Sequence, residues 1–441
     1  MATSPAATAP PSLGPIGLAP ILTIQFIGTL GYSIAIPLLV FVVSDLGGAS
    51  WTYGVVGATY SLFQLFGAPL LGRWSDRSGR RIVLVVSQAG TFLAWLLFLV
   101  ALALPVTSFG RLWGASLTLP LLVVFASRAF DGLTGGNVSV ASAYVADLTV
   151  GSPQRRQAAF GQMGMAASLG FALGPALAGL LGGTAWGYTL PIAVAATISG
   201  LATALCAFAL PETKERCPDG PPEQPAVTRV LGHQHRRCDR TPPPRAPRVV
   251  RQPRVVALIG ATFVLFLAFN FFYAGFPVHA EGPLGWGPGR MGYFFAVMSG
   301  AMIVAQGPLL TWVAKRIPAP VTFAAGMALL VAAFLLFLSM SEVLLFAGAI
   351  AFAFGNGLAW PTFQARLADV AGDGAQGSVQ GAATSAGSVA SILGMVAGGA
   401  LYPAIGSWVF GVGALLFLAV TVLTPVWFRD GPAPPAADVG S

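Results

Sequence analysis

The sequence predicts an all-α integral membrane protein with twelve transmembrane helices in two six-helix halves, and three observations lead to this fold class. Hydrophobic residues make up 55% of the 441 residues and charged residues only 9%, against about 25% charged residues in an average soluble protein. Apolar runs long enough for the roughly 20 residues that cross a bilayer recur along the chain. The charge pattern of the first half is repeated in the second. This composition excludes a soluble enzyme, a nucleic-acid-binding protein and a secreted disulfide scaffold.

The apolar runs give the expected spans in chain order. Helices fit these lengths, whereas barrel strands would be about 10 residues long with alternating polarity. The first 17 residues are uncharged and rich in Ala, Pro, Ser and Thr. Without a positive n-region they predict a disordered tail and no signal peptide. The expected spans are residues 18–43, 53–72, 82–104, 117–146, 157–182, 188–210, 255–276, 291–313, 319–339, 343–366, 376–402 and 406–428.

A segment of different composition separates the sixth and seventh spans. Residues 211–254 contain ten prolines and ten Lys or Arg against five acids, which predicts a disordered, basic, Pro-rich cytoplasmic linker. The linker divides the chain into an N-terminal half at 18–210 and a C-terminal half at 255–428, with tails at 1–17 and 429–441. Its cysteines and histidines have no standard zinc-site spacing, so we expect neither a metal nor a cofactor.

The two halves resemble each other in sequence. Residues 157–211 and 374–428 are both uncharged runs of 55 residues that end a half. A Pro-Leu-Leu sequence precedes a basic loop in each half, beginning at Pro69 and at Pro308. Many transporters consist of two such halves, with the substrate site near the bilayer midplane between them.

The distribution of Lys and Arg predicts the orientation in the membrane. The loops after spans two, four, six, eight and ten, together with the tails, hold 20 of the 23 Lys and Arg residues. Arg111 and Arg290 lie on the opposite side, and Arg128 lies inside span four. By the positive-inside rule, both termini face the cytoplasm. We expect the protein to reside in the inner or plasma membrane of the cell. Topology also explains the net charge of +8 without a nucleic-acid partner.

The loop after span two carries the strongest local motif, Gly72 to Arg81 with the sequence GRWSDRSGRR. Its glycines allow a tight turn at the membrane surface. An acid among four arginines indicates a charge network that can form and break, and a loop that only set topology would need neither the acid nor the glycines. The residues expected to form a cytoplasmic gate are Gly72, Asp76, Arg77, Gly79, Arg80, Arg81 and, at the end of span four, Asp147.

Span five contains a small-residue motif, Gly170 to Gly179 with the sequence GFALGPALAG. Gly170 and Gly174 are four residues apart, so they share a helix face and let another helix approach closely. Pro175 removes a backbone hydrogen bond and permits a bend. Ordinary packing of small residues between membrane helices is the alternative explanation.

Span four contains two opposite charges, Arg128 and Asp131. Residues three apart share a helix face, and a charge at the bilayer centre costs roughly 2.5–3.5 kcal/mol on insertion scales. Asp131 is the only acid well inside an expected span. We therefore expect Asp131 to carry a proton, with Arg128 as its charge partner. A structural ion pair with no role in coupling is the alternative.

These motifs together resemble the major facilitator superfamily of transporters. Residues 72–81 match its loop signature G-x-x-x-D-R-x-G-R-R/K. Residues 170–179 are similar to the drug-antiporter element G-x-x-x-G-P-x-x-G-G, with Ala178 in place of a glycine. Residues 128–132 are similar to R-x-x-Q-G, with an acid in place of the glutamine. With the sequence AYVADLT at 143–149, the chain looks most like the tetracycline/proton antiporter branch.

The resemblance implies a fold, a mechanism and several contacts. The fold would be that of the superfamily, and transport would proceed by alternating access. Arg80 would pair with Asp147, and Asp76 would face the start of span eleven. Proton-coupled members commonly carry an acid in span one, whereas this chain has Gln25 and Tyr32 there.

Spans one, four, seven and ten line the central cavity in this superfamily, and the few polar or amphipathic residues within spans are expected to contribute to it. An aromatic cavity with few hydrogen-bonding groups suits a flat amphipathic molecule better than a sugar or a multiply charged anion. Hydrogen bonding between helices is the alternative role for each residue. The expected cavity residues are Gln25, Tyr32, Gln64, Asn137, Gln162, Asn270, Tyr273, Asn356, Trp360 and Gln364.

The leading hypothesis for function is secondary active export of a drug-like or tetracycline-like amphipathic compound by proton antiport, with no enzymatic activity. A proton-independent facilitator or exchanger of a small metabolite is an alternative, which the missing acid in span one permits. A transporter-like membrane sensor or assembly partner is a second alternative, although a static scaffold would not need the gate motif. We expect the partners to be a small-molecule substrate, protons and the lipid bilayer, and the protein to be a monomer.

Overall fold

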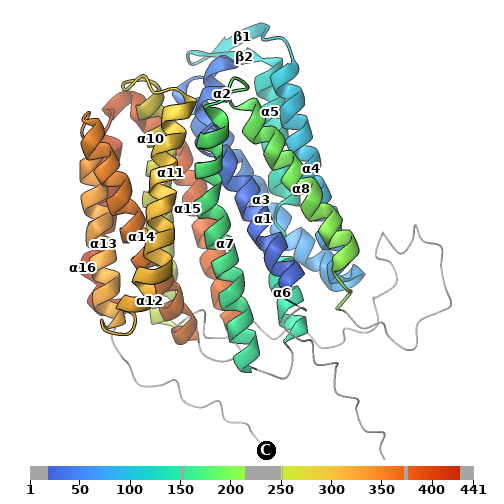
Figure 1. Ribbon diagram of the computed structural model, residues 1–441, viewed down its shortest axis with the longest axis vertical. Helices are drawn as coiled ribbons and strands as arrows, with labels where there is room; N and C mark the ends of the chain where they lie inside the picture. The colour runs from blue at the N-terminus through green and yellow to red at the C-terminus, as the bar shows by residue number, and fades with distance from the viewer. Residues whose placement is uncertain (1–17, 150–152, 214–249, 251, 372–375, 428–441) are drawn as a thin grey trace, which may run out of the picture.

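The computed structural model describes residues 18–149, 153–213, 250, 252–371 and 376–427. The described chain is almost entirely helical and forms two helical bundles (Figure 1). The expected terminal tails and most of the expected linker lie outside the described residues. Helices α3 and α15, and helices α7 and α11, make the main contacts between the two bundles.

The N-terminal bundle contains the first eight helices in chain order. They are α1 (Ala19–Ala35), α2 (Leu39–Asp45), α3 (Ser50–Ser78), α4 (Arg80–Ala103), α5 (Leu119–Thr134), α6 (Val138–Leu148), α7 (Pro153–Gly182) and α8 (Thr189–Ala209).

The C-terminal bundle contains the remaining described helices and one π-helical turn. They are α10 (Pro253–Glu281), α11 (Pro288–Val304), η3 (Ala305–Leu309), α12 (Leu310–Val313), α13 (Ala319–Leu336), α14 (Glu342–Ala371), α15 (Gln376–Ile405) and α16 (Trp408–Trp427).

Ten spans in the described part of the chain are long and apolar enough to cross a membrane, and the pair α1–α2, bent by 43°, makes an eleventh. The run expected as span four is divided between α5 and α6, which are interrupted at Gly135–Asn137. Close approach of α3 accompanies this interruption, because a Cβ at Gly136 would collide with the backbone of Ala68. The sequence predicted each of these spans as one continuous helix, whereas the structure breaks both.

A β-hairpin, which the sequence analysis did not predict, lies between α4 and α5. Strands β1 (Ser108–Leu112) and β2 (Ala115–Thr118) pair antiparallel, with Leu112 opposite Ala115. The two turn residues have positive φ, 44° at Trp113 and 83° at Gly114, as a type I′ turn requires. Trp51 Nε1 donates to the carbonyl oxygen of Trp113 at 3.0 Å, which ties the hairpin to α3.

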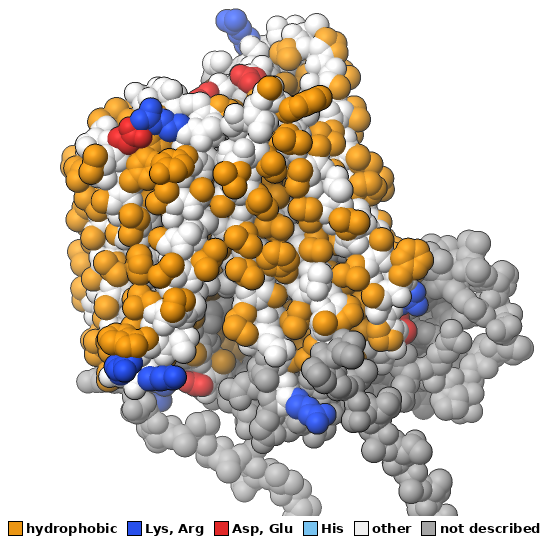
Figure 2. Space-filling view, in the orientation of Figure 1, with side chains coloured by type: hydrophobic (Ala, Val, Ile, Leu, Met, Phe, Trp, Pro, Cys, Tyr) orange, Lys and Arg blue, Asp and Glu red, His pale blue; other side chains and the backbone are white. Residues whose placement is uncertain are grey.

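The two ends of the molecule differ in charge. We call the end with β1 and β2 the hairpin end, and the end with residues 73–81, Arg155 and residues 315–316 the basic end. Figure 2 shows a hydrophobic band between them, with Lys and Arg gathered mainly along the lower edge. A broad apolar band bordered by charge is the surface expected of a protein that spans a bilayer.

The two bundles contact each other near the hairpin end. The Tyr53 hydroxyl of α3 donates to the carbonyl oxygen of Tyr273 of α10 at 2.6 Å. A Cβ at Gly54 would collide with the backbone of Met395 of α15. Small residues therefore let the helices of the two bundles meet backbone to backbone at this end.

Candidate functional site

Helix α5 places an ion pair inside the N-terminal bundle. Arg128 and Asp131 are each 3% exposed, and Arg128 Nη1 lies 3.2 Å from Asp131 Oδ2. The helical spacing of three residues puts both side chains on one face. Thr118 caps the start of α5 by accepting from the backbone N–H of Leu121 at 3.3 Å. The pair is therefore fixed by a well-defined helix and removed from solvent.

Two aromatic side chains of α4 enclose the guanidinium of Arg128. Its central carbon lies 4.4 Å from the ring centre of Trp95 and 5.1 Å from that of Phe98. Both rings are fully buried. A desolvated cation–π contact of this kind contributes about 2 kcal/mol. The Thr91 side chain of the same helix hydrogen-bonds to Asp131, so α4 contacts both members of the pair.

Sequence reasoning missed the contribution of α4. Thr91, Trp95 and Phe98 recur at intervals of four and three residues, the spacing of a single helix face. That pattern could have identified the face, but it gives no sign of which helix the face meets.

Several buried donors of α4 and α5 have no acceptor among the described residues. They are Arg128 Nε, Arg128 Nη2, Trp95 Nε1 and Gln88 Nε2. Buried polar groups without partners are rare in folded proteins. Because Asp131 engages only one nitrogen of the guanidinium, the pair can rearrange without first breaking other hydrogen bonds to Arg128.

Polar side chains of α1 and α3 approach the same region. The rings of Tyr32 and Tyr60 are 4.7 Å apart, and Gln64 Nε2 donates to the Tyr60 hydroxyl at 3.1 Å. A Cβ at Gly135, four residues after Asp131, would lie 3.1 Å from that hydroxyl. The structure thus brings the expected cavity residues Tyr32 and Gln64 close to the ion pair.

Two expected cavity residues of α10 contact other helices. Asn270 Nδ2 donates to Ser391 Oγ of α15 at 3.0 Å and to the carbonyl oxygen of Phe266 at 2.7 Å. The ring of Tyr273 packs edge-on against Phe171 of α7, with ring centres 5.9 Å apart. Both side chains therefore take part in helix packing, which is the alternative role that the sequence left open for them.

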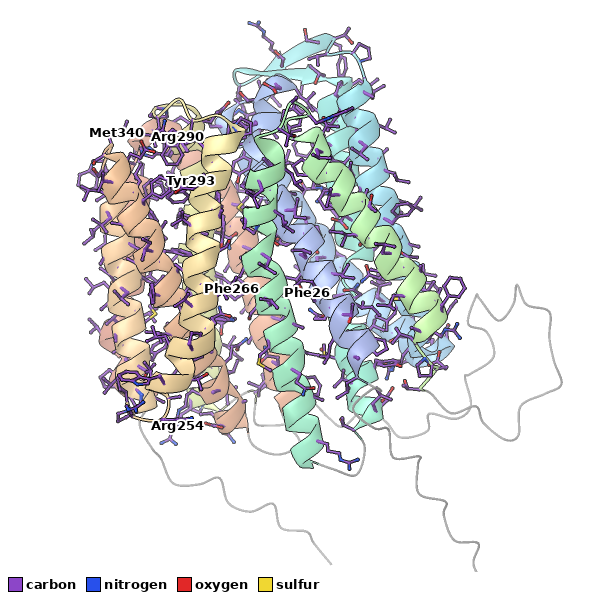
Figure 3. All side chains as sticks on the ribbon, in the orientation of Figure 1. Phe26, Arg254, Phe266, Arg290, Tyr293 and Met340 are labelled. Carbon is purple, nitrogen blue, oxygen red and sulfur yellow. The ribbon has the colours of Figure 1, made fainter. Side chains whose placement is uncertain are left out.

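The other expected cavity residues fall into two groups. Asn356 Nδ2 lies 3.8 Å from the sulfur of Met302, and Trp360 packs edge-on against Phe266 at 5.4 Å between ring centres. Figure 3 places Phe266 and Phe26 at a similar height on either side of α7. The remaining amides make no side-chain hydrogen bond within the described residues, and they are Gln25, Asn137, Gln162 and Gln364.

Arg80 organises the expected gate at the basic end. Its Nε lies 2.9 Å from Asp147 Oδ2, the pairing that the resemblance implies, and its Nη1 lies 2.5 Å from Asp76 Oδ1. Gly79 has a φ of 101°, a left-handed conformation that favours glycine. The first side chains of α15, which Asp76 was expected to face, lie outside the described side chains.

Glu212 also belongs to this network, although the sequence analysis placed it in the linker. Its carboxylate accepts from the backbone N–H groups of Arg80 at 2.8 Å and Arg81 at 3.2 Å. The Tyr144 hydroxyl donates to the neighbouring carbonyl oxygen of Pro211 at 3.1 Å. The residues that follow α8 are therefore bound to the N-terminal bundle. Of the other expected gate residues, Gly72 is partly buried and Arg77 is exposed.

The small-residue motif of α7 faces two different helices. A Cβ at Gly170 would collide with the backbone of α1, and one at Gly174 would collide with Ser33 of α1. Ser33 Oγ donates to the carbonyl oxygen of Gly170 at 3.1 Å. Gly179 instead lies against Gly292 of α11, in the other bundle. Pro175 lies within α7, which continues past it.

Comparison with known proteins assigns the family. The sequence profile described as "Major Facilitator Superfamily" matches residues 21–394 and 258–441. The chain is 27% identical over 408 residues to the class G tetracycline resistance protein of Vibrio anguillarum, covering 90% of this chain and 94% of that protein. It is 28% identical over 384 residues to the class C tetracycline resistance protein of Escherichia coli, covering 86% and 88%.

A solved structure shows the same fold. The crystal structure of the human organic anion transporter MFSD10 (TETRAN) matches with a TM-score of 0.63 at 22% identity, covering 94% of this chain and 100% of that one. The expected fold class is thereby confirmed, while the number of spans is established only to ten or eleven within the described residues. The chain belongs to the Major Facilitator Superfamily and is a multi-pass membrane transporter, not an enzyme.

Proposed function

We propose that this transporter exports a flat amphipathic compound of the tetracycline-like class by proton antiport. The observation that carries the proposal is the buried ion pair of Arg128 and Asp131, whose charged atoms lie 3.2 Å apart. Side chains of α4 enclose this pair. The tetracycline resistance proteins that match most of the chain support the substrate class.

Asp131 is the proposed proton carrier because protonation changes the charge of a buried site. A neutral Asp131 would release Arg128, whose remaining nitrogens have no described acceptor. Alternation between a paired and a released Arg128 gives the two states that a coupled cycle requires. A potential of 100 mV supplies about 2.3 kcal/mol for each charge moved across the membrane, which can drive substrate uphill.

The expected cavity residues favour an aromatic, amphipathic substrate. Trp360 and Phe266 offer ring faces, while the amides of Gln25 and Gln364 have no described side-chain partner. A mostly apolar wall with a few polar groups is typical of sites for drug-sized organic molecules.

The charge distribution supports an orientation. We propose that the basic end faces the cytoplasm and that both termini lie there, as the positive-inside rule requires. Arg80 with Asp76 and Asp147 would then form the cytoplasmic gate. The contacts between bundles near the hairpin end support a state that is closed on the outer side. The membrane would be the cell membrane.

Uptake into everted membrane vesicles tests the proposal. With an imposed proton gradient and a panel of tetracyclines and other aromatic amphiphiles, wild type should accumulate at least one compound above its external concentration. Asp131→Asn should bring internal and external concentrations only to equality. Asp369→Asn is the matched control, because Asp369 is an exposed acid of α14 and should leave accumulation unchanged.

Proton-independent exchange is the second candidate. It is favoured because the first span has no acid in its interior. Asp45 is the only acid of α1 and α2, and it lies at the hairpin end, where it accepts from the Tyr188 hydroxyl at 2.9 Å. If wild type equilibrates a compound but never concentrates it under a proton gradient, this second function replaces the first.

A further inference from the structure

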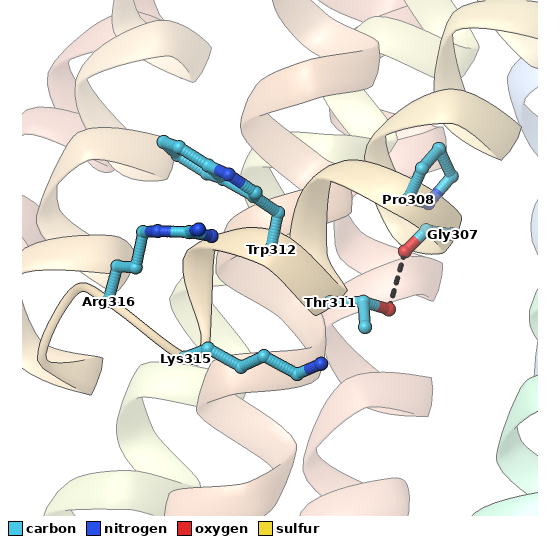
Figure 4. Close-up of a pocket in the computed structure, with 6 residues that line it drawn as sticks. All are labelled: Gly307, Pro308, Thr311, Trp312, Lys315 and Arg316. Atoms are coloured by element: carbon cyan, nitrogen blue, oxygen red, sulfur yellow. Dashed lines mark hydrogen bonds between the residues drawn. The ribbon is translucent and has the colours of Figure 1, made fainter.

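An exposed face of the segment 307–316 in the C-terminal bundle forms a recess at the basic end. Figure 4 shows its lining. The recess has a volume of about 490 Å³ and is lined by Gly307, Pro308, Thr311, Trp312, Lys315 and Arg316. These residues form three pairs spaced four residues apart, and the pairs lie in turn in η3, in α12 and in the turn that follows α12. All six are exposed.

The backbone explains why the upper part of the recess is empty of side chains. Pro308 has no N–H to donate, and the turn Ala305–Leu309 is widened to a π-helical turn in which the N–H of Leu310 donates to the carbonyl oxygen of Ala305. Gly307 adds no side chain. Thr311 Oγ1 donates to the carbonyl oxygen of Gly307 at 2.7 Å, which satisfies the polar backbone. This part of the recess is therefore shallow and uncharged.

The lower part of the recess carries two positive charges. Among the residues that the structure describes, no acid forms an ion pair with Lys315 or Arg316. The guanidinium of Arg316 lies over the ring of Trp312, 4.7 Å from its centre. This contact orients the cation beside the ring, and Lys315 extends on the side of Thr311 (Figure 4).

The surroundings place this face at the boundary between hydrocarbon and water. Trp312 is 52% exposed, and Ile303 and Val304, which precede the recess, are 40% and 49% exposed. Tryptophan is enriched at the level of the lipid headgroups, and cations next to a spanning segment attract anionic lipids. From α11 through α12 to the turn after it, the exposed side chains therefore change from apolar to indole to cationic. This is the order of acyl chain, ester and phosphate in a phospholipid.

We propose that this recess binds the headgroup of one anionic phospholipid. Lys315 and Arg316 contact its phosphate, Trp312 lies at the level of the ester groups, and an acyl chain passes Gly307 and Pro308. The negative charge of the lipid partly neutralises a cationic pair that has no ion-paired acid among the described residues. A zwitterionic lipid is bound more weakly because its own ammonium group competes for the phosphate. The proposal does not depend on the identity of the transported substrate.

Lipid binding to the purified full-length protein in a neutral detergent tests the proposal. Native mass spectrometry measures the occupancy of the tightest lipid site. One titration uses phosphatidylglycerol, and a second uses phosphatidylcholine with the same acyl chains. Phosphatidylglycerol should bind more tightly. The double variant Lys315→Gln/Arg316→Gln should bind it about 30-fold more weakly, and each single variant about fivefold, since each cation near the surface contributes about 1 kcal/mol.

Controls separate this site from general charge effects and from free phosphate. Arg254→Gln removes an exposed cation at the same end and should bind phosphatidylglycerol as wild type does. Trp312→Leu retains both cations and should lose affinity only a few-fold. Millimolar inorganic phosphate should not displace the lipid.

Three results would overturn the proposal. Phosphatidylcholine could bind as tightly as phosphatidylglycerol, or the folded double variant could retain phosphatidylglycerol with unchanged affinity. Displacement of the lipid by inorganic phosphate at equal concentration would assign the recess to a soluble anion. Loss of transport in Asp131→Asn has no bearing on these outcomes, so the two proposals fail separately.

Discussion

The two bundles follow related helical plans but bury different chemistry. The N-terminal bundle encloses the Arg128–Asp131 pair. At the corresponding positions of α14, the C-terminal bundle has Ile350 and Ala353. Its core is instead a cluster of phenylalanines, in which Phe272 stacks on Phe352 at 4.7 Å between ring centres. His279 and Tyr402, 2.6 Å apart between ring nitrogen and hydroxyl oxygen, are a buried polar pair near its hairpin end.

This difference shows how two similar halves can divide the work of transport. A buried ion pair with spare donors has more than one arrangement, whereas interlocked aromatic rings have a single well-packed one. We infer that the N-terminal bundle carries the coupling chemistry and that the C-terminal bundle acts mainly as a rigid wall. The basic ends of the two bundles differ as well, because Arg80 has acids of its own bundle as partners and Lys315 and Arg316 have no ion-paired acid among the described residues.

The largest expected effect comes from breaking the buried pair. Arg128→Ala leaves Asp131 buried without its cation, and removal of one partner of a buried pair costs about 3–5 kcal/mol. The variant should be recovered in much lower amounts, with a strongly reduced melting temperature in detergent. Arg290→Ala breaks an exposed pair with Glu342 and should melt close to wild type. Equal stability of the two variants would remove the distinction between the sites.

A smaller loss of stability is expected from the aromatic core of the other bundle. Phe272→Leu removes ring stacking on Phe276, Phe337 and Phe352, and aromatic pairs contribute about 0.5–1.5 kcal/mol each. The melting temperature should fall, while the number of protons released for each substrate bound should stay constant. Phe208→Ala, at a side chain that is 89% exposed, serves as the control for stability. A changed proton count in Phe272→Leu would show that the C-terminal bundle takes part in coupling.

The gate should affect rate more than affinity. Asp76→Asn removes one partner of Arg80 at the basic end, where α3 ends. The ion pair of Arg128 and Asp131 lies on a different helix, α5. Turnover should fall by roughly tenfold, the effect of a shift of about 1.4 kcal/mol between two states, with substrate affinity within a few-fold of wild type. Asp369→Asn, at the equivalent end of the other bundle, should transport at the normal rate. Unchanged turnover in Asp76→Asn would contradict the role of this network as a gate.

The smallest effect is expected at the aromatic clamp. Trp95→Leu removes the better of the two rings over Arg128. Transport should fall only several-fold, because Phe98 keeps a ring 5.1 Å from the guanidinium carbon and only part of the contact energy of a desolvated cation–π pair is lost. It should also displace the pH at which substrate-induced proton release is half-maximal. Trp95→Phe keeps an aromatic face and should restore most of both properties. A pH profile that is identical in all three proteins would limit Trp95 to packing.

Much of this architecture could be predicted from the sequence because hydropathy and helical spacing are local properties. The apolar runs predicted the helices, and the spacing of Arg128 and Asp131 placed both on one face. The close contacts of Gly170 and Gly174 with α1 follow from their size and separation.

Features that depend on distant segments could not be predicted. The enclosure of Arg128 by Trp95 requires knowing that α4 packs against α5, and the contact of Glu212 with the loop at Arg80 spans more than a hundred residues of chain. The hairpin was missed although Trp113-Gly114 is a plausible two-residue turn, because both strands are short, with five and four residues. Asn270 was expected in the cavity, yet its amide donates a hydrogen bond to Ser391 of α15. A single sequence does not reveal which polar groups pair between helices.

Proton release on substrate binding is the most direct test of the central claim that Asp131 carries the proton. Purified protein in a weakly buffered solution near neutral pH, with a pH indicator dye, is mixed with a substrate found in the vesicle screen, and substrate binding is followed in parallel. Wild type should release close to one proton for each substrate bound, and Asp131→Asn should bind substrate with little or no release. If Asp131→Asn releases as many protons as wild type, the ion pair is structural and the proton is carried elsewhere.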